Sequence, residues 1–546
     1  MQVAATALGG RDFEGQVTKE INGKPYILIG NEQQLRAIGS GKKVIGRINK
    51  VKQTCTRQGL GKYQWVDDGT PSSEYAGDAD LSNSDTLRDA DASDHDSPLL
   101  CSTRLDVGKT RTKYYGVGAD GTQTDYSAAN TGLTYSADAN YLIFRDIDLS
   151  KNAADTNNTE WTPLMFSGTM LGAVSNDGDT EASLWKAVGA DDASVVHATA
   201  ARPVISHVVV NQKDMVSNVK GDQLDVSKQQ GIGFFASITN KTVMNSNSLG
   251  SAGTAVVSNL KLQDVSVTNH TSESYIPPTL LSALTSAVGG LLDLLLKALK
   301  LLTFGQVNLD LNLRGLLTLH KDNPSNLATG AFAGRIYGDT KVTDCEVADV
   351  SVSSVSRMTG GFVGYVEGAT RYDAVSDIVG ALTNVLSKIL GVIPFLGLGD
   401  LVNWLLSGTL GLNALVPVGY YNPVISNSSV NGFKENVVIG NKNNPQAGGF
   451  VGAQIGAIIE NSSVTSTNGF TVQATQYAGG FAGVSRNGNV GGLLNSLGID
   501  LLSALRPQSL IENSNLTVDG DGKVTVSATD YAGGFSGAMA NAYAVN

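Results

Sequence analysis

The sequence has 546 residues, enough for a large core, with a formal net charge of −11 and a charged fraction of only 16%. Lysine and arginine do not cluster along the sequence, which argues against nucleic acid as a partner, and an acidic chain also avoids anionic membrane surfaces.

Residues 1–50 are interpreted as the first coil or cap of a repeating β fold. The first ten residues, MQVAATALGG, lack the basic start and apolar core of a signal peptide. The sequence also stops within a repeated phrase, at GGFSGAMANAYAVN. We therefore expect a segment of a longer secreted protein.

Residues 51–140 form a polar insertion with two of the three cysteines. A disulfide between Cys55 and Cys101 would close a long loop, which the chain-entropy model stabilises by roughly 4 kcal/mol. The low charge and the abundance of Ser, Thr, Asn and Gly are typical of secreted chains. We therefore expect this disulfide; the alternative is two free thiols.

Two acidic runs lie inside this insertion, DADLSNSD at 78–85 and DADASDHD at 89–96. Asp78, Asp80 and Asp85 are candidate Ca²⁺ ligands because closely spaced oxygen donors suit that ion. The EF-hand pattern is absent, so a solvated loop is the simpler interpretation. No other cofactor is expected.

A short phrase centred on phenylalanine recurs along the chain. It reads GFFAS, GAFAG, GGFVG, GGFVG, GGFAG and GGFSG around Phe235, Phe332, Phe362, Phe450, Phe481 and Phe535. A second phrase, such as VISNSSV or IIENSSVT, follows each of the first five, and a third, such as FTVQATQYA, closes each of the last two units. Three β-prone pieces in about 30 residues are the period of a solenoid.

The predicted fold class is an all-β solenoid, a right-handed parallel β-helix of roughly eight coils. The phenylalanines are predicted to form a column, one strand spacing (~4.8 Å) apart. A second column is predicted for Asn259, Asn427, Asn461 and Asn513, with Cys345 replacing asparagine once as a buried filler. Its amides are expected to turn inward and to bond the coils above and below.

Apolar insertions interrupt the coils, which are placed at 141–274, 330–368 and 421–546. The insertions occupy 275–329, 369–420 and 487–508, and their leucine spacing predicts short helices. Charged residues, glycine and proline break the two longer ones and the third is too short, so none is expected to span a membrane. We expect them to pack against the solenoid; the alternative is a hydrophobic site for lipid or a partner helix.

The unit GGFVG…IENSSVT resembles the GLUG-type repeat of bacterial surface proteins. The stretches NEQQLRAIGSG (31–41) and YLIFRDIDLSKN…EWTPLMFSGTMLG (141–172) resemble the leader coils that precede such repeats. The resemblance covers about two thirds of the chain and implies a right-handed parallel β-helix on a Gram-positive surface. It says little about the ligand, and the long insertions depart from the pattern.

Two pairs of repeated residues are candidate functional groups. Glu460 and Glu512 precede the asparagine column in equivalent positions, matched in other coils by Ser426, Asp344 and Ser258. Stacked coils would place the two carboxylates about one strand spacing apart, near the ~5–5.5 Å that retaining glycosidases use. A solvated surface ladder is the simpler interpretation, and a cation site is a further alternative.

Tyr477 and Tyr531 precede the phenylalanine column and are predicted to stack. With Gln476 and Asp530 they would form a sugar-binding face; the alternative is a packing contact. The sequence holds no metal-spaced histidine pair and no nucleophile, phosphate or dinucleotide motif, and so gives no positive sign of an enzyme.

Analogy at the level of the fold favours a non-enzymatic adhesin-like module, extracellular and on the cell wall or cell surface of a Gram-positive bacterium. It would bind a host or neighbouring-cell glycan or surface protein. One alternative is a glycoside hydrolase or lyase acting on polysaccharide. Another is a purely structural stalk whose ligand-binding domain lies past Asn546.

Overall fold

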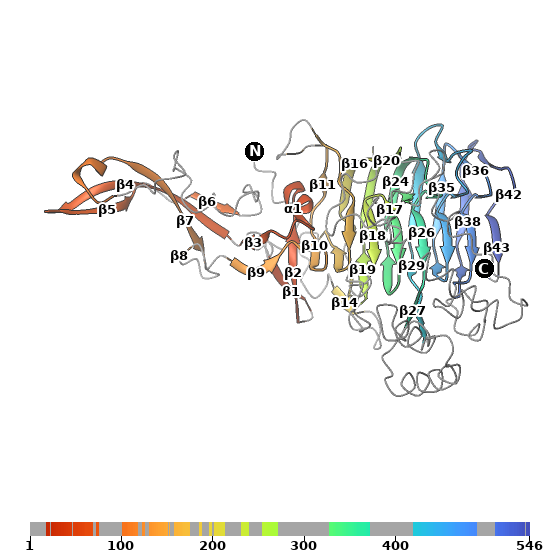
Figure 1. Cartoon of the computed structure of the whole chain (residues 1–546), viewed down its shortest axis with the longest axis horizontal. Helices are drawn as coiled ribbons and strands as arrows, with labels where there is room; N and C mark the ends of the chain where they lie inside the picture. The colour runs from red at the N-terminus through yellow and green to blue at the C-terminus, as the bar shows by residue number, and fades with distance from the viewer. Residues whose placement is uncertain are drawn as a thin grey trace, which may run out of the picture.

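The computed structural model of the chain is a parallel β-solenoid with a long β arm at its N-terminal end (Figure 1). The structure describes residues 18–21, 23–45, 47–68, 72–75, 101–117, 123–125, 130–150, 152, 158–174, 185–187, 196–198, 201–212, 231–239, 254–270, 327–371, 419–488, 508–540 and 542–545. The predicted helical insertions at 275–329, 369–420 and 487–508 lie almost entirely outside these residues.

The longest sheet, sheet 1, runs along the whole rod. Its first two strands are antiparallel, and every later pair is parallel, so that each turn of the chain adds one strand. In spatial order its strands are β1 (Thr18–Ile21), β2 (Lys24–Ile29), β10 (Asn140–Ile143), β13 (Thr169–Gly172), β19 (Ala255–Ser258), β23 (Thr340–Thr343), β29 (Val424–Ser426), β34 (Ile458–Glu460), β39 (Leu510–Glu512) and β44 (Tyr543–Val545).

Sheet 2 follows sheet 1 in each coil, and sheet 3 follows sheet 2 in three of the coils; the strands of both sheets also pair in parallel. Sheet 2 contains β11 (Ile147–Asp148), β16 (Val204–Gln212), β20 (Lys261–Asn269), β24 (Glu346–Ser354), β30 (Ser429–Phe433), β35 (Ser463–Ser466) and β40 (Asn515–Val518). Sheet 3 contains β31 (Val438–Gly440), β36 (Phe470–Ala474) and β41 (Val524–Ala528).

Sheet 5 completes each coil before the chain returns to sheet 1, and sheet 4 precedes it in every coil after the first. Sheet 4 contains β17 (Gly231–Ile232), β21 (Ala328–Gly330), β25 (Met358–Gly360), β32 (Gln446–Gly448), β37 (Tyr477–Gly479) and β42 (Tyr531–Gly533). Sheet 5 contains β12 (Leu164–Phe166), β18 (Phe235–Thr239), β22 (Ala333–Tyr337), β26 (Val363–Glu367), β33 (Val451–Ile455), β38 (Ala482–Arg486) and β43 (Ser536–Ala540).

The predicted phenylalanine column is confirmed and forms the centre of the core. Successive ring centroids from Phe332 to Phe535 are 4.7–4.8 Å apart, and their planes lie within 11° of parallel. The column continues to Phe235 and then, beyond the repeated phrase, to Phe166 and Tyr141 at 5.3–6.2 Å. Each pair adds about 0.5–1.5 kcal/mol beyond the burial of its apolar area.

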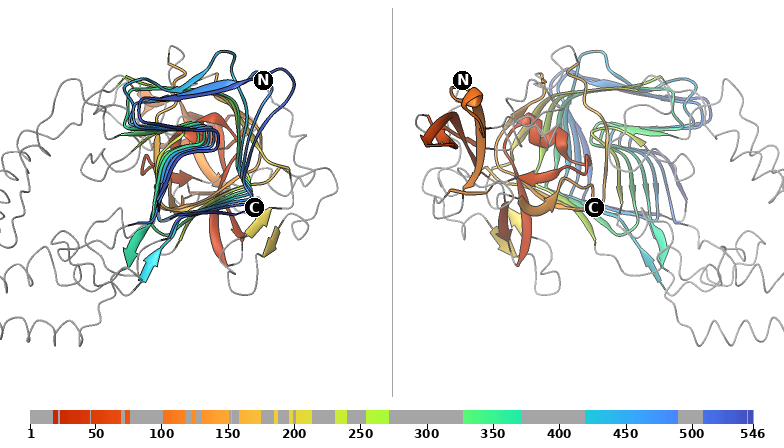
Figure 2. Two further views of the ribbon diagram at one scale, coloured as in Figure 1. Left: turned by 90° about the vertical axis from the view of Figure 1, so that its right-hand side faces the viewer. Right: turned by 60° about the vertical axis from the view of Figure 1, so that its left-hand side comes forward.

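The glycines beside each phenylalanine allow sheets 4 and 5 to fold inward against each other, as the end-on view shows (Figure 2). A Cβ on Gly364 would lie 2.5 Å from the amide nitrogen of Thr329, and one on Gly483 would lie 2.7 Å from the carbonyl oxygen of Ala447. These glycines do not have positive φ. Close approach of two backbones therefore requires them, and the inward fold carries each phenylalanine into the core.

The asparagine column exists, but its predicted role holds only at Asn259 and one of its predicted members was wrong. Asn259, Asn427, Asn461 and Asn513 all have φ of 46–58°, at the corner where the chain passes from sheet 1 to sheet 2. Asparagine tolerates this left-handed conformation better than most residues. Asn259 is buried, and its side-chain amide donates to the carbonyl oxygen of Gly172 in the neighbouring coil at 2.8 Å, as predicted. Asn427 and Asn461 are exposed, so the amides do not continue as an inward ladder along the column.

The residue in line with these asparagines is Asp344 and not Cys345, since Asp344 has φ 57° and follows Thr343, which pairs with Ser258 and Ser426. The inward ladder lies one position later. The backbone amide of Cys345 donates to the hydroxyl of Ser428, and the backbone amide of Ser428 donates to the hydroxyl of Ser462. Serine hydroxyls therefore link neighbouring coils at this corner, and the predicted burial of Cys345 is confirmed.

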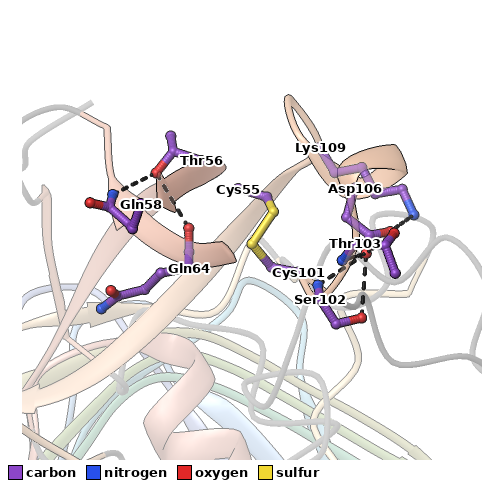
Figure 3. Close-up of a disulfide and its surroundings, with 9 residues drawn as sticks. All are labelled: Cys55, Thr56, Gln58, Gln64, Cys101, Ser102, Thr103, Asp106 and Lys109. Carbon is purple, nitrogen blue, oxygen red and sulfur yellow. Dashed lines mark hydrogen bonds and ion pairs between the residues drawn. A yellow bond between two sulfur atoms is a disulfide. The ribbon is translucent and has the colours of Figure 1, made fainter. Parts of the chain in front are cut away.

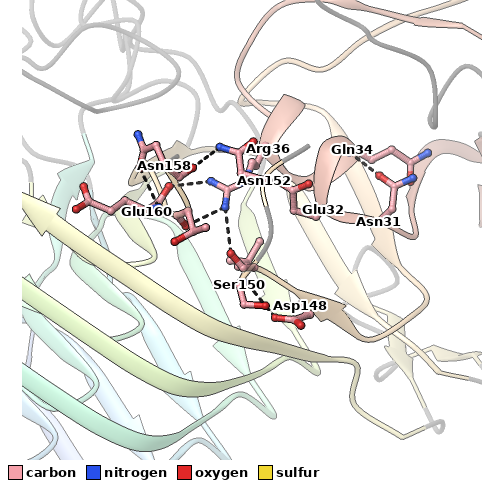
Figure 4. A network of polar contacts seen from close by, with 11 residues as sticks. Asn31, Glu32, Gln34, Arg36, Asp148, Ser150, Asn152, Asn158 and Glu160 are labelled. Atoms are coloured by element: carbon pink, nitrogen blue, oxygen red, sulfur yellow. Dashed lines mark hydrogen bonds and ion pairs between the residues drawn. The ribbon is translucent and has the colours of Figure 1, made fainter. Parts of the chain in front are cut away.

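A short helix, α1 (Glu32–Ala37), lies at the N-terminal end of the rod, where Asn31 caps it by accepting from the amide of Gln34. Arg36 ties the helix to the first coils (Figure 4). Its guanidinium pairs with Glu32 and donates to the carbonyl oxygens of Glu160 at 2.8 Å and Thr159 at 3.0 Å. Ends of stacked β coils need such covering because their backbone groups are otherwise unpaired.

The arm contains antiparallel strands from the predicted polar insertion. They are β4 (Arg47–Gly59), β5 (Lys62–Asp67), β6 (Ser72–Tyr75), β7 (Thr110–Val117) and β8 (Gln123–Asp125), with the 3₁₀ turn η2 at Arg104–Asp106. The predicted disulfide between Cys55 and Cys101 is confirmed, with the two Cα atoms 5.5 Å apart (Figure 3). It fixes η2 against β4.

Three antiparallel strand pairs lie outside the five sheets. They are β3 (Lys43–Ile45) with β9 (Asn130–Thr134), β14 (Trp185–Ala187) with β15 (Val196–Ala198), and β27 (Ala369–Arg371) with β28 (Gly419–Tyr421). The first pair lies between the arm and the first coils in the chain, and the third joins the two ends of the segment 372–418.

Candidate functional site

The strongest candidate site is the tyrosine pair near the C-terminal end of the rod. Tyr477 in β37 and Tyr531 in β42 are direct register partners on sheet 4. Their rings stack with centroids 5.6 Å apart and planes 11° from parallel, as the repeat predicts. Tyr531 is 60% exposed, whereas Tyr477 is partly buried against an apolar cluster that includes Tyr365 and Val484.

Polar groups lie beside this pair. Gln476 and Asp530 immediately precede the two tyrosines and are both exposed. The backbone around them is fixed, because the amide of Tyr531 donates to the carbonyl oxygen of Gln476 at 2.8 Å. The surface therefore offers one open aromatic face, an amide and a carboxylate on rigid β backbone, which is a composition suited to sugar rings.

The two candidate carboxylates also occupy paired positions. Glu460 of β34 lies directly beside Glu512 of β39, and both point outward because Ile459 and Ile511 fill the core. The equivalent residue two coils before Glu460 is Thr343 rather than the predicted Asp344, for the reason given above. No side chain in the described ranges forms an ion pair with either carboxylate.

Cys345 has the environment of a structural thiol. It is fully buried, and its Sγ lies 3.3 Å from the carbonyl oxygen of Thr343. Burial raises the pKa of the thiol to about 12, well above physiological pH. A reactive cysteine instead needs an accessible site that lowers this pKa, so Cys345 has no nucleophilic role.

The candidate Ca²⁺ ligands Asp78, Asp80 and Asp85 lie outside the described residues. Within the described part of the chain, no group of three or more histidine, cysteine or acidic side chains is arranged to hold a metal ion. Among the helices of that part, none has the length and hydrophobicity needed to cross a bilayer.

The sequence alone did not predict a row of charged side chains on the outer face of sheet 2. The imidazole Nδ1 of His207 lies 2.8 Å from Asp148, and its Nε2 lies 3.7 Å from Asp264. The ammonium group of Lys434 pairs with Asp264 at 2.7 Å. The four residues come from four different coils and link those coils across the surface. They do not occupy one repeated position of the sequence, so the repeat gives no sign of them.

Comparison with known proteins identifies one family model that matches the chain, that of the GLUG motif, over residues 443–468. The range contains β32, β33, β34 and β35, together with the turn at Phe450 and the corner at Asn461. The motif thus corresponds to most of one coil, and the chain contains a GLUG motif there. No curated protein and no solved structure matches the chain.

Proposed function

We propose that the protein is an extracellular module on the surface of a Gram-positive bacterium and that it binds an extended glycan or a surface protein of another cell. The stacked pair of Tyr477 and Tyr531 carries this proposal, because it places an open aromatic face on a rigid rod. The ligand would lie against Tyr531, with Gln476 and Asp530 bonding its polar groups.

Rigidity supports a binding role for this face. Each tyrosine is the first residue of a strand whose backbone is paired with the other, and the ring of Tyr477 also packs against the apolar cluster. A ligand therefore orders few additional side chains when it binds, which lowers the entropic cost of association.

An extracellular location is supported by the disulfide of the arm and by the GLUG motif. Disulfides persist in oxidising compartments and are rare in the cytosol. The Cys55–Cys101 bridge is located in the arm, away from the solenoid core.

The test is binding of the full chain to glycan and cell-surface protein arrays, repeated with Tyr531→Ser. Loss of one stacking face should weaken binding by roughly tenfold. The matched control is Met539→Ser, which changes a 38% exposed side chain on the neighbouring strand β43. A ligand that binds Tyr531→Ser as well as the unaltered chain contradicts the proposal, and silence on both arrays favours a purely structural stalk.

The paired carboxylates of Glu460 and Glu512 favour one second candidate, a glycoside hydrolase or lyase that acts on polysaccharide. Their strands are direct neighbours at a spacing of about 4.8 Å, near the carboxyl separation of retaining glycosidases. Release of reducing sugar from a polysaccharide panel, abolished in Glu460→Gln and Glu512→Gln, would establish it. If the unaltered chain and both variants bind a glycan but release no reducing sugar, the result supports the adhesin instead.

A further inference from the structure

The outer end of the arm displays apolar side chains that no other described residue covers. Leu60 is 94% exposed and Leu105 is 89% exposed, and Val66 and Val107 are exposed to 38% and 46%. The exposed large hydrophobic residues of the described solenoid reach at most 60%, at Tyr531. The two leucines are therefore the most solvent-exposed large apolar side chains in the described part of the protein.

Local structure holds both leucines outward. Leu60 is at the tip of the β4–β5 hairpin between Gly59 and Gly61, and Gly61 has φ +70°. The tip lies five residues beyond Cys55, or about 17 Å along the strand. Figure 1 shows this hairpin at the far end of the arm from the solenoid.

Leu105 lies in η2, which is a fixed loop and not a loose one. The carboxylate of Asp106 accepts from the amides of Ser102 at 3.0 Å and Thr103 at 2.8 Å, and Lys109 pairs with it at 2.7 Å (Figure 3). The disulfide joins the start of this loop to β4.

Among the described residues, the exposed charged side chains near the outer end of the arm are basic, although the chain as a whole is acidic. They include Arg57, Lys62 and Arg104. The exposed acids of these segments, Asp67 and Asp68, lie at the end of β5 away from the tip, where they accept from Gln53 and Thr54. Basic residues of separate segments are brought together by strand pairing and the disulfide, so their grouping is not visible along the sequence.

We propose that the outer end of the arm docks on an anionic lipid bilayer, with Leu60 and Leu105 entering the acyl boundary and the basic side chains contacting the headgroups. Single exposed side chains on convex turns do not form the contiguous patch that a stable protein interface needs. A bilayer accepts such side chains without a preformed pocket. Tyr63 and Trp65, close behind the tip, are residue types enriched at membrane surfaces.

This docking surface is separate from the tyrosine pair, which lies near the opposite end of the rod in Figure 1. It also differs from the expectation, based on net charge alone, that the protein avoids anionic membranes. The net charge of −11 belongs to the whole chain, whereas salt screens the field of a bilayer beyond a Debye length of about 8 Å, so that nearby charges dominate the interaction.

The experiment is co-sedimentation of the full chain with vesicles of phosphatidylcholine alone and of phosphatidylcholine mixed with an equal amount of phosphatidylglycerol. We expect binding to the anionic vesicles and much weaker binding to the neutral ones. Leu60→Asp should weaken binding by at least about tenfold, because it removes a buried apolar contact and adds a negative charge. Arg57→Glu should weaken it by about tenfold or more, since each basic residue near the surface contributes about fivefold.

The matched control is Val438→Asp, which places the same charge at a 40% exposed apolar position on sheet 3 of the solenoid and should leave binding unchanged. The proposal is overturned if the unaltered chain does not sediment with anionic vesicles, or if Val438→Asp and Leu60→Asp weaken binding equally. It is also overturned if Leu60→Asp has no effect and salt alone abolishes binding, as expected for an acidic glycan or protein partner.

Discussion

Individual side chains in this solenoid act mainly through the residues in the coils directly beside them. Phe450 shows this well, since its ring lies 4.8 Å from Phe362 on one side and 4.8 Å from Phe481 on the other. All three rings are fully buried. A change at one such position therefore removes contacts from three coils at once.

Replacing Phe450 with alanine should lower the free energy of unfolding by about 3–5 kcal/mol, because it removes a large core side chain and leaves a cavity between two rings. Phe535→Ala should cost clearly less, since Phe535 is partly exposed and the structure shows only one ring partner for it. Urea unfolding followed by circular dichroism measures both. Equal losses for the two variants would contradict a continuous column.

The phenylalanine and tyrosine pairings follow from the sequence because each residue sits at a fixed place in a repeated phrase. The asparagine column shows the limit of that reasoning. Repetition alone identifies Asn461 as a special position, but the same letters fit an inward amide and a left-handed corner equally well. The backbone decides between them, and φ is 48°.

Among the larger elements, the arm is the part that sequence reasoning described least. Its strands pair over long separations, as β4 does with β7, and no repeat marks the partners. The cysteines indicated one contact between Cys55 and Cys101, which the structure contains. The sheet around that contact, and the exposed leucines that it presents, depend on tertiary pairing that propensity does not determine.

The η2 loop of the arm should lose stability in acid. Hydrogen bonds from Lys109, then from Ser102 and Thr103, hold the pKa of Asp106 well below its usual range. A lowered pKa in the folded loop stabilises it fully above the ordinary value of about 3.9, and the contribution is lost as the pH falls below that value.

The measurement is hydrogen exchange of peptides that cover residues 101–110. Protection should fall by up to about tenfold between about pH 6 and pH 3, which is the factor set by the unfolded pKa alone. Peptides around Phe450 serve as the control and should keep their protection. A loop whose protection is the same at both pH values would show that the carboxylate of Asp106 does not stabilise it.

Across the whole molecule, the period of the sequence determines the architecture because every coil repeats the same contacts. Phe450 and Phe481 are 31 residues apart, and the strands of their coils pair residue for residue in all five sheets. The interval between Phe362 and Phe450 is longer because residues 372–418 intervene, yet β26 and β33 still pair. The repeat therefore predicts which strands stack, whereas the content of an insertion has to be learned separately.

A solenoid of this kind should tolerate the loss of one whole coil but not of half a coil. Deleting residues 446–476 joins Pro445 to Tyr477, so that β37 replaces β32 as the neighbour of β25 and Phe481 replaces Phe450 beside Phe362. The shortened protein should fold cooperatively and be about 4.8 Å shorter by small-angle scattering. Deleting only residues 446–460 brings the corner at Asn461 directly after sheet 3, and this variant should not form a stable rod. If the two deletions are equally damaging, stability does not reside in the stacking of equivalent coils.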